Sequence, residues 1–447
     1  MAESKLGIII LAAGEGKRMK SALPKVLQPV GGKPMIGHVL ETARALSPAR
    51  VVVVTGAGRD RVEGYLHAHY GFAGIAVQAP QNGTGHAVMC AGAQFSDFTG
   101  DLLILYGDCP LVTAATLKKL VKKHQGHALS MIGINAANPR KYGRLVMAKD
   151  GGLEKIVEFA DASAAEKAIP FCNSGVMIAK SPLLFAALDQ LKNDNAGDEH
   201  YLTDVVAILR KEGHKIPVIE GDEKEFQGVN SKSELAGAER DLQARFSKAA
   251  MDAGATLVDP PSVHFSHDTK LGRDVTVWPH VVFGEGVVVE EGATIYSFSH
   301  LEGCRVRKGA SVGPYARLRP GADIGEGAKV GNFVEIKKAK LEEGAKVSHL
   351  AYIGDARVGK GANVGAGTIT CNYDGHAKHF TDIGEGAFIG SNSALIAPVK
   401  IGAGAIIGAG SVITRDVPAD ALAVSRARQT EQAGGAKTFR KSRKGQS

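Results

Sequence analysis

The second half of the sequence carries an aliphatic residue at every sixth position. One such run consists of Ile383, Ile389, Leu395, Ile401, Ile407 and Ile413, and earlier runs begin at Leu271, Val306, Leu341 and Val358. A period of six is typical of a parallel β-helix, in which three hexads form a coil and one aliphatic side chain per edge points inward. Glycine beside these positions suits corners that need a positive φ. We therefore predict a β-helix rather than a loosely ordered glycine-rich segment.

One stretch of this half departs from the period. After Val364 the next aliphatic residues are due at 370, 376 and 382, but residues 370–382 are rich in polar and basic side chains. Loops on rigid repeats commonly carry function. We interpret residues 370–382 as a functional loop extruded from the coil; an insertion without a role is the alternative.

Length and cysteine content limit the class of protein. A chain of 447 residues is expected to form two or more domains. Its five cysteines include no CxxC pair, which favours a reducing cytoplasmic location over a disulfide framework or a zinc ribbon. The sequence begins without a signal-type apolar run, and no stretch approaches the ~20 apolar residues of a membrane span. We expect no membrane partner.

Positive charge is concentrated at the end of the chain. From Arg426 onward there are seven basic residues and one acidic residue, which account for six of the eight net positive charges. A solvated, disordered tail is the simplest interpretation. A nucleic-acid partner is not expected, because the tail has no interleaved aromatic residues and no recognised binding module. Contact with a phosphorylated cofactor remains a third hypothesis.

The first half reads as an α/β domain. Residues 7–13 and 51–55 are short, continuous apolar runs, and a helix is expected between them from Pro34 to Leu46. Strand, helix and strand at this spacing predict a parallel sheet of the doubly wound, Rossmann-like type. Such sheets bind phosphates at a glycine-rich turn after a strand.

A glycine-rich turn, Gly14-Glu15-Gly16, follows the first predicted strand, and Arg18 and Lys25 come soon after it. The turn alone is weak support, because any tight turn can contain these glycines. The two cations favour a triphosphate site, although no Lys-Ser/Thr pair closes the turn as in a Walker loop. Another buried strand starts at Asp101 and leads to Asp108, where a single carboxylate beside substrate phosphates suits Mg²⁺. A turn or helix-cap role for Asp108 is the alternative.

A single helix is expected at residues 231–254, with Ser231 or Ser233 at its start and Gly254 at its end. We interpret it as a connecting arm. The predicted organisation is therefore a domain at 1–230, the arm at 231–254, the β-helix at 255–430 and a basic tail at 431–447.

The motifs together resemble a known family. The motifs that carry the resemblance are Leu11-Ala-Ala-Gly-Glu-Gly-Lys-Arg-Met, Leu23-Pro-Lys-Val-Leu, Gln81-Asn-Gly-Thr-Gly-His-Ala, Tyr106-Gly-Asp, Tyr142-Gly-Arg and the hexads. Together they are similar to those of the bacterial bifunctional N-acetylglucosamine-1-phosphate uridyltransferase / glucosamine-1-phosphate N-acetyltransferases. The resemblance covers nearly the whole chain, and the order of the two halves makes it specific. It implies a left-handed β-helix, Mg²⁺, the substrates UTP and acetyl-CoA, and a homotrimer with acetyl-transfer sites between subunits.

The resemblance also implies roles for residues of the first half. The uridyl-nucleotide set is Leu11, Ala12, Gly14, Lys25, Gln78, Gln81, Gly83, Thr84, Tyr106 and Asp108, with Arg18 and Lys25 on the triphosphate. The N-acetylglucosamine-1-phosphate set is Gly143, Glu158, Asn173 and Asn230, and the Mg²⁺ ligands are Asp108 and Asn230. Two positions depart from the family: Lys17 stands where Thr is common, and Asn82 where Leu is frequent.

Roles in the β-helix follow from the same resemblance. The glucosamine-1-phosphate set is Arg319, Lys337, Tyr352, Asn363 and Lys378. The acetyl-CoA set is Asn372, Tyr373, Ser391, Ala409 and Arg426. His349 is expected to be the general base and Glu335 its supporting carboxylate, whereas in isolation His349 would read as a surface histidine.

Two other interpretations remain. A monofunctional sugar-1-phosphate nucleotidyltransferase would use its β-helix only for oligomerisation, and a β-helix binding module would carry a degenerate nucleotide fold. His349 and the pair Arg319 and Lys337 argue against the first, since a scaffold does not need them. Retention of Arg18, Lys25 and Asp108 argues against the second.

Overall fold

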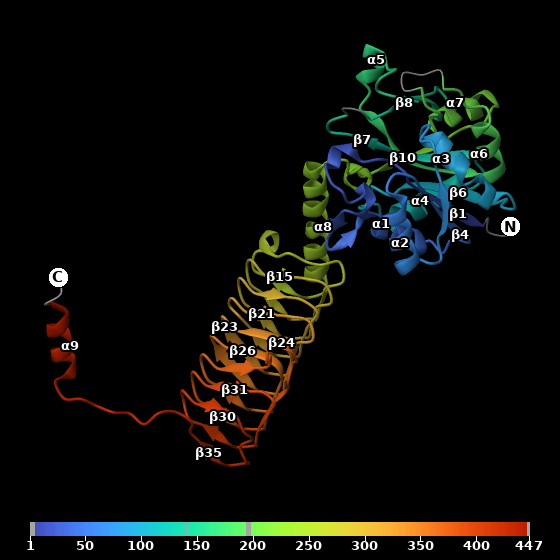
Figure 1. The fold of residues 1–447 in the computed structure, drawn as a ribbon. Coiled ribbons are helices and arrows are strands. Elements are labelled where there is room, and N and C mark those ends of the chain that lie inside the picture. Colours follow the sequence, from blue (N-terminus) through green and yellow to red (C-terminus); the bar gives the residue numbers. More distant parts are fainter. Residues whose placement is uncertain (1–4, 140–141, 194–197, 445–447) are drawn as a thin grey trace. The chain divides into compact units, whose positions relative to one another are not determined.

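The computed structural model describes residues 5–139, 142–193 and 198–444 and divides into two compact units, Met1–Arg245 and Phe246–Ser447 (Figure 1). Each unit has its own hydrophobic core. No helix among these residues is long and apolar enough to cross a membrane.

A nine-stranded sheet with the order β11-β7-β10-β6-β1-β4-β5 forms the centre of the first unit, and β8 joins it through β10 and pairs with β9. Its strands are β1 Leu6–Ala12, β4 Arg50–Thr55, β5 Gly74–Val77, β6 Asp101–Tyr106, β7 Leu129–Asn135, β8 Arg144–Met147, β9 Leu153–Val157, β10 Phe171–Lys180 and β11 Val218–Gly221. The short strands β2 Pro29–Val30 and β3 Lys33–Pro34 form a separate pair. Strands β1, β4, β5 and β6 are parallel, as predicted.

The sheet is mixed rather than wholly parallel, because β10 runs antiparallel to both β6 and β7. The β8–β9 hairpin precedes β10 in the chain, and β10 also pairs antiparallel with β8. A continuous apolar run records burial on both faces but not strand direction. The sequence therefore predicted the buried strands β1, β4 and β6 correctly, whereas it gave no prediction for β10, whose antiparallel direction makes the sheet mixed.

Helices cover both faces of this sheet. They are α1 Met35–Arg44, α2 Arg59–His69, α3 Thr84–Cys90, α4 Ala114–His124, α5 Ala164–Lys167, α6 Ser181–Leu188 and α7 Asp204–Lys211. Alternate residues of β1 enter different cores: Ile8 and Ile10 pack with residues of α1, α2 and α4, whereas Ile9 and Leu11 pack with residues of α3, α6 and α7. This is the doubly wound arrangement, in which ligands bind at the carboxyl ends of parallel strands.

Helix α8 spans Lys232–Asp252, close to the predicted 231–254. The Ser231 hydroxyl accepts the backbone N–H of Glu234 at 3.3 Å, so Ser231 is the cap at its start. Gly254 follows its end with a φ of 100°, a conformation that glycine adopts without strain.

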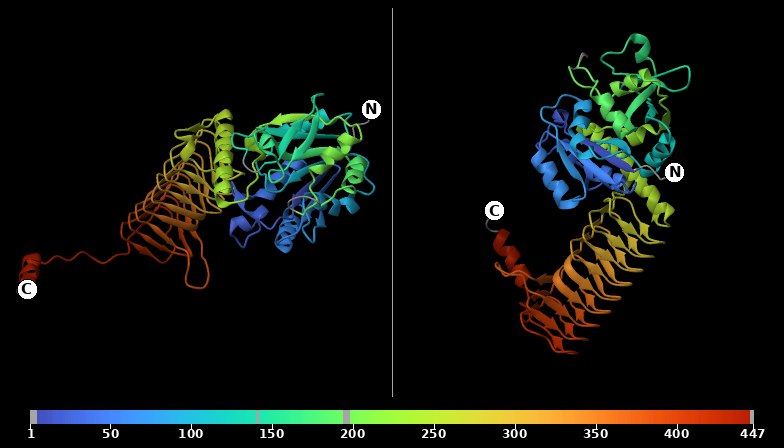
Figure 2. Two further views of the ribbon diagram at one scale, coloured as in Figure 1. Left: turned by 90° about the horizontal axis from the view of Figure 1, so that it is seen from above. Right: turned by 90° about the vertical axis from the view of Figure 1, so that its right-hand side faces the viewer.

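The second unit is a parallel β-helix whose coils stack along one axis (Figure 2). One ladder consists of β12 Thr256–Leu257, β14 Thr276–Val277, β17 Thr294–Ile295, β20 Ser311–Val312, β23 Lys329–Asn332, β25 Lys346–His349, β27 Asn363–Val364, β30 Phe388–Ile389, β33 Ile406–Ile407 and β35 Leu422–Ala423. The other faces contain β13 Lys270–Leu271, β15 Val282–Phe283, β16 Val288–Val289, β18 His300–Leu301, β19 Arg305–Val306, β21 Arg317–Leu318, β22 Asp323–Ile324, β24 Glu335–Leu341, β26 Tyr352–Val358, β28 Ile369–Cys371, β29 Thr381–Ile383, β31 Ala394–Ile396, β32 Val399–Ile401 and β34 Val412–Ile413.

The aliphatic residues of the six-residue period lie inside these coils, as predicted. Leu271 in the first coil is half-buried, and the repeat residues that follow it are buried. The fold is therefore the expected one: an α/β nucleotidyltransferase-like unit and a left-handed parallel β-helix of hexapeptide repeats. After the last coil, residues Gly435–Lys444 form helix α9 with exposed side chains, where a disordered tail was the simplest expectation.

The predicted loop is shorter than residues 370–382. Along one ladder the stacked residues are Ile295, Val312, Val330, Val347, Val364, Ile389 and Ile407. Successive members follow one another at a nearly constant interval in the sequence, but the interval between Val364 and Ile389 is clearly longer. Thr370 is fully buried at its repeat position and Thr381 is fully buried where the coil resumes. The extruded loop is thus residues 372–380. The hydroxyl of Thr370 donates to the carbonyl oxygen of Gly354 at 3.1 Å, which allows this side chain to replace an aliphatic one inside the coil.

Candidate active sites

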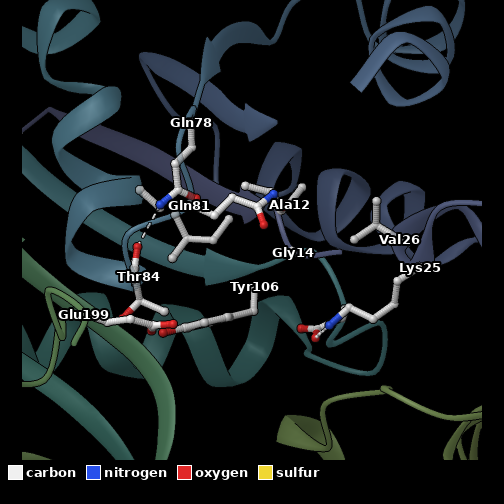
Figure 3. A pocket seen from close by; sticks show the side chains of 14 residues that line it. Ala12, Gly14, Lys25, Val26, Gln78, Gln81, Thr84, Tyr106 and Glu199 are labelled. Carbon is white, nitrogen blue, oxygen red and sulfur yellow. Dashed lines mark hydrogen bonds and ion pairs between the residues drawn. The ribbon is translucent and has the colours of Figure 1, made fainter. Parts of the chain in front are cut away.

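A cavity of about 340 Å³ opens at the carboxyl ends of β1, β5 and β6 in the first unit (Figure 3). Its lining consists of Leu11, Ala12, Ala13, Gly14, Lys25, Val26, Gln78, Gln81, Gly83, Thr84, Ala87, Tyr106, Asp108 and Glu199. The structure therefore brings together all ten residues expected to contact the uridyl nucleotide. Figure 3 shows Lys25 at one end of the cavity and Gln78 and Thr84 at the other.

The lining differs from the sequence-based expectation at two residues, Glu199 and Arg18. Glu199 contributes a carboxylate to the cavity wall, and no strand end or glycine turn marks it in the sequence. Arg18 lies on the short 3-10 helix Lys17–Met19 with an exposed side chain, outside the lining. Lys17, the first departure from the family pattern, forms an ion pair with Glu15 at 2.5 Å in solvent.

Two glutamine side chains form hydrogen bonds that connect the loops around the cavity. Nε2 of Gln81 donates to the carbonyl oxygen of Ala13 at 2.5 Å, which ties the loop after β5 to the turn after β1. Nε2 of Gln78 donates to the carbonyl oxygen of Gly83 at 2.8 Å, the bond drawn in Figure 3. The second departure from the family, Asn82, is exposed, and its carbonyl oxygen accepts the N–H of His200 at 3.0 Å.

The expected Mg²⁺ ligands converge on a single point. Nζ of Lys25 lies 2.5 Å from Oδ2 of Asp108 and 2.9 Å from Oδ1 of Asn230, and the side chains of Lys25 and Asp108 are both largely buried. An ammonium group therefore lies between the two oxygens that a divalent cation would use. One carboxylate and one amide oxygen, with substrate phosphates, form a donor set that suits Mg²⁺. Among the described residues, no group of three or more His, Cys, Asp or Glu is placed to hold a metal without a substrate.

The start of α8 positions Asn230. Its backbone N–H donates to Oε2 of Glu234 at 2.8 Å, and the N–H of the preceding Val229 donates to the carbonyl oxygen of Asp108 at 3.0 Å. The two candidate ligands, which are far apart in the sequence, are therefore held together by backbone contacts as well as by Lys25.

The residues expected to bind the amino sugar also lie together. The N–H of Asn173 donates to the carbonyl oxygen of Gly143 at 2.8 Å, and a Cβ on Gly143 would come within 3.4 Å of the Glu158 carboxylate. Burial raises the pKa of Glu158, although Thr203 donates a hydrogen bond to it at 3.2 Å. Burial also raises the pKa of Tyr106, with smaller contributions from the Glu158 and Asp108 carboxylates.

In the second unit, basic side chains from different coils form a cluster. Lys337 on β24 lies beside Lys378 of the 372–380 loop, and this neighbouring ammonium group is the main reason that the pKa of Lys337 is lowered. Arg319 adds to the effect and forms an ion pair with Glu335 at 2.9 Å. Positive charges held at close range are characteristic of a phosphate site. Tyr352 stacks directly on Glu335 in the next coil.

The candidate base His349 has a different partner from the expected one. Nδ1 of His349 lies 2.6 Å from Oδ1 of Asn332, which occupies the equivalent position one coil earlier. The carboxylate of Glu335 instead faces Arg319 at 2.9 Å and Arg317 at 3.7 Å. Asn332 was missed in the sequence, but the repeat points to it, because Asn332 precedes His349 by the same interval that separates the stacked pair Val330 and Val347.

The 372–380 loop is stabilised by one carboxylate. Asp374 accepts the N–H groups of His376 and Ala377 and pairs with His379 at 2.6 Å, and these contacts hold its pKa well below the usual range. At the base of the loop, Nδ2 of Asn372 donates to Asp355 and lies 3.5 Å from the Tyr352 hydroxyl. Tyr373 is exposed and donates to a carbonyl oxygen of the loop.

The remaining predicted residues lie on other coils of the same unit. Asn363 stacks between Lys346 and Phe388 on the ladder that also contains β25. Arg426 donates from Nη1 to the carbonyl oxygen of Ala409 at 2.8 Å, and the carbonyl oxygen of Ser391 accepts the N–H of Gly410. Ser391, Ala409 and Arg426 therefore form one connected group.

An apolar ridge runs along one corner of the coils and reaches His349. The ridge consists of His280, Phe298, Tyr315, Phe333 and Leu350, all with φ between 51° and 61°. The rings stack with centroids 4.9, 4.9 and 5.2 Å apart, and about half of Phe298, Tyr315 and Phe333 is exposed. Bulky residues seldom adopt a positive φ. Other corners of the coils, such as Lys338 and Asn392, also have a positive φ, so this conformation belongs to the repeat.

Taken together, the fold and the first site define a nucleotidyltransferase unit followed by a hexapeptide-repeat transferase unit. A family model described as MobA-like NTP transferase domain matches residues 8–207, and one for the bacterial transferase hexapeptide (six repeats) matches residues 380–415.

Similar proteins match the chain over nearly its whole length. The bifunctional protein GlmU of Paramagnetospirillum magneticum is 55% identical over 443 residues, which is 98% of each chain. That of Jannaschia sp. is 52% identical over 96% of this chain and 94% of its own, and that of Azorhizobium caulinodans is 51% identical over 99% of each. The chain belongs to the GlmU family of bifunctional proteins.

Proposed function

We propose that this chain makes UDP-N-acetylglucosamine in two steps, one in each unit. The β-helix transfers an acetyl group from acetyl-CoA to glucosamine-1-phosphate, and the first unit transfers uridylate from UTP to the resulting N-acetylglucosamine-1-phosphate. The observation that carries this function is full-length similarity to bifunctional relatives, with a separate candidate site in each unit. A monofunctional nucleotidyltransferase would need neither the Lys337–Lys378 cluster nor His349.

In uridyl transfer, a phosphate oxygen of the sugar phosphate attacks the α-phosphorus of UTP. A new P–O bond forms as the bond to the β-phosphate breaks, and pyrophosphate leaves. The reaction needs alignment and charge neutralisation rather than a covalent nucleophile. Lys25 and Arg18 supply positive charge, and Gly143, Glu158 and Asn173 hold the amino sugar. Mg²⁺ bound to Asp108 and Asn230 would neutralise phosphate charge.

The two ends of the cavity support this orientation of the nucleotide. Lys25, which pairs with Asp108, lies at the end suited to phosphates. Gln78, which donates to Gly83, lies with Thr84 at the end suited to the base. Leu11, Ala12, Gly14, Gln81 and Tyr106 also line the cavity.

In acetyl transfer, the amino group of glucosamine-1-phosphate attacks the thioester carbonyl, a C–N bond forms, and the CoA thiolate leaves. Nδ1–H of His349 donates to Asn332, which leaves Nε2 free to accept the proton of the attacking amine. Arg319, Lys337 and Lys378 bind the phosphate, and Tyr352 and Asn363 complete the sugar site. Asn372, Tyr373, Ser391, Ala409 and Arg426 contact acetyl-CoA.

We further propose that the chain forms a homotrimer through the apolar ridge. Exposed aromatic surface of this kind is characteristic of an interface. Among the described residues, no hydrogen bond or ion pair joins the Lys337 cluster to His349 or to the group around Arg426, which fits acetyl-transfer sites assembled from more than one subunit. The proposed functional segments remain 1–230, 231–254, 255–430 and 431–447, and the proposed location is the cytoplasm.

Product analysis by mass spectrometry tests the function. Purified protein is supplied with Mg²⁺, UTP, acetyl-CoA and glucosamine-1-phosphate, and we expect UDP-N-acetylglucosamine together with free CoA and pyrophosphate. If product forms only from pre-acetylated sugar phosphate, the acetyl-transfer assignment is wrong and the monofunctional alternative holds. If neither sugar reacts, both assignments are wrong.

A further inference from the structure

Gln78 lines the nucleotide cavity, and the protein contacts its side-chain amide through Nε2. Gln78 is 5% exposed, and its Nε2 donates to the carbonyl oxygen of Gly83 at 2.8 Å. The same Nε2 lies 3.3 Å from Nδ1 of His86 on α3. The flipped amide would place Oε1 against the Gly83 oxygen, where two acceptors would repel each other. The observed orientation of the amide is therefore the favourable one.

The contacts of His86 fix its tautomer. An amide N–H group can only donate, so Nδ1 of His86 must accept and the ring proton must be on Nε2. That nitrogen lies 3.7 Å from Sγ of Cys90, one turn further along α3. Burial raises the pKa of the Cys90 thiol, so its sulfur remains neutral and can serve as a weak acceptor. The hydrogen bonds thus run from His86 to Cys90 and from Gln78 to both His86 and Gly83.

This arrangement determines which atom of Gln78 is available to a ligand. Both N–H bonds of Nε2 are used within the protein, which leaves the acceptor Oε1. The N3–H group of uracil can donate to such an oxygen, whereas N3 of cytosine carries a lone pair at the same position. An oxygen fixed at this point therefore favours UTP over CTP.

We propose that His86 is a positioning residue that sets the base selectivity of uridyl transfer by holding the Gln78 amide in this orientation. The inference rests on the proposed function, in which Gln78 contacts the base. His86 does not line the cavity, so it acts through Gln78 and not on the nucleotide itself.

The test compares kcat/KM for UTP and CTP, with N-acetylglucosamine-1-phosphate as the acceptor. In His86→Leu the amide loses one of its two acceptors, and we expect the UTP/CTP ratio to fall about tenfold, since a hydrogen bond to a neutral group is worth roughly a factor of ten. His86→Asn places Oδ1 near the position of Nδ1 and is expected to restore the ratio. His67→Leu changes an exposed histidine on α2 and is the matched control.

The UTP/CTP ratio of kcat/KM distinguishes a positioning role of His86 from a purely structural one. A general loss of folding would lower both rates and leave their ratio unchanged, and acetyl transfer reports whether the rest of the chain is intact. A ratio within twofold of the wild type in His86→Leu would overturn the inference, as would a ratio in His86→Asn as low as in His86→Leu.

Gln78→Ala distinguishes failure of the inference from failure of the proposed function. If Gln78→Ala lowers the ratio and His86→Leu does not, Gln78 contacts the base but His86 does not position it. If neither variant changes the ratio while uridyl transfer continues, the assignment of Gln78 to the base is wrong.

Discussion

Nδ1 of His349 lies 2.6 Å from Oδ1 of Asn332, the residue stacked beneath it in the β-helix. The amide oxygen of Asn332 can only accept, so this contact keeps the proton on Nδ1. Nε2 then has a free lone pair, which is the form of histidine that removes a proton. A neutral amide, rather than the expected Glu335 carboxylate, therefore orients the candidate base.

Replacing Asn332 with leucine should slow acetyl transfer. We expect kcat to fall about tenfold, as for the loss of one orienting hydrogen bond, and the pH profile of kcat to change. Steady-state release of CoA measures both. His349→Ala should abolish acetyl transfer and leave uridyl transfer intact. Wild-type kcat and pH profile in Asn332→Leu would show that Asn332 does not orient the base.

Asp108→Asn should separate the two activities. The substitution removes the only carboxylate of the proposed Mg²⁺ site, and we expect uridyl transfer to fall by about a hundredfold or more, as when a key electrostatic group is removed. Acetyl transfer should stay within about twofold of the wild type, because its site lies in the other unit. Chelating Mg²⁺ in the wild type should have the same selective effect. Equal loss of both activities would contradict the assignment.

Glu158→Gln should make the first unit more heat-stable at neutral pH while weakening sugar binding. Burial raises the pKa of Glu158 in the folded state, so its favourable contribution is present below the unfolded-state pKa and is lost as pH rises through the folded-state pKa. At pH 7.5, which is above the unfolded-state pKa, the raised pKa of Glu158 therefore opposes folding, and glutamine removes this effect. Calorimetry should show a higher Tm for the variant at pH 7.5 and a smaller difference near pH 4.5.

Asp150→Asn is a control of opposite sign for this experiment. Hydrogen bonds from Gly152 and Arg210 lower the pKa of Asp150, so its contribution is present above the unfolded-state pKa and lost as pH falls through the folded-state pKa. The variant should not raise Tm at pH 7.5. If Glu158→Gln and Asp150→Asn shift Tm in the same direction, the burial of Glu158 does not explain the result.

Asp374→Ala should weaken binding of glucosamine-1-phosphate from a distance. The carboxylate holds the turn of the 372–380 loop, and Lys378 of the phosphate cluster is on that loop. Without it, we expect KM for glucosamine-1-phosphate to rise about tenfold, as for the loss of hydrogen bonds that order the loop. Asp374→Asn retains an acceptor oxygen and should be affected less. Unchanged KM in the alanine variant would mean that Lys378 does not depend on this turn.

Substitutions in the apolar ridge should affect assembly and acetyl transfer together. The double variant Tyr315→Ser and Phe333→Ser removes two stacked, half-exposed rings. We expect analytical ultracentrifugation to show a lower mass, with loss of acetyl transfer and retention of uridyl transfer. Phe72→Ser removes a similarly exposed ring from the first unit and is the matched control. An unchanged mass in the double variant would rule out the ridge as the interface.

The sequence predicted the β-helix well because the aliphatic period reports directly which side chains are buried. Ile389, Leu395 and Ile401 are fully buried, as that period requires. It could not predict that Thr370 takes an inward position, since burial of threonine depends on carbonyl groups of neighbouring coils. The direction of β10 was also beyond reach, because strand direction depends on pairing rather than on apolar content.

The candidate sites were predicted unevenly for a related reason. Motifs and glycine turns mark residues near the nucleotide, such as Gln81, because backbone close to a ligand constrains the local sequence. A side chain that acts from the next coil, like Asn332, or from a distant loop, like Glu199, has no such local signature. The role of such a side chain can be inferred only when the coil length or the tertiary structure shows which residues lie next to it.

The coil that carries the 372–380 loop also shows how this fold can acquire new chemistry. Val364 and Ile389 stack normally although the chain between them is longer than in the neighbouring coils, and the coil from Ile389 to Ile407 returns to the usual length. Each coil contacts only its neighbours, so an insertion costs mainly the closure of its own loop. Lengthening or replacing a loop is therefore an almost independent evolutionary step, in which a solenoid can change what it binds without losing its stacking register.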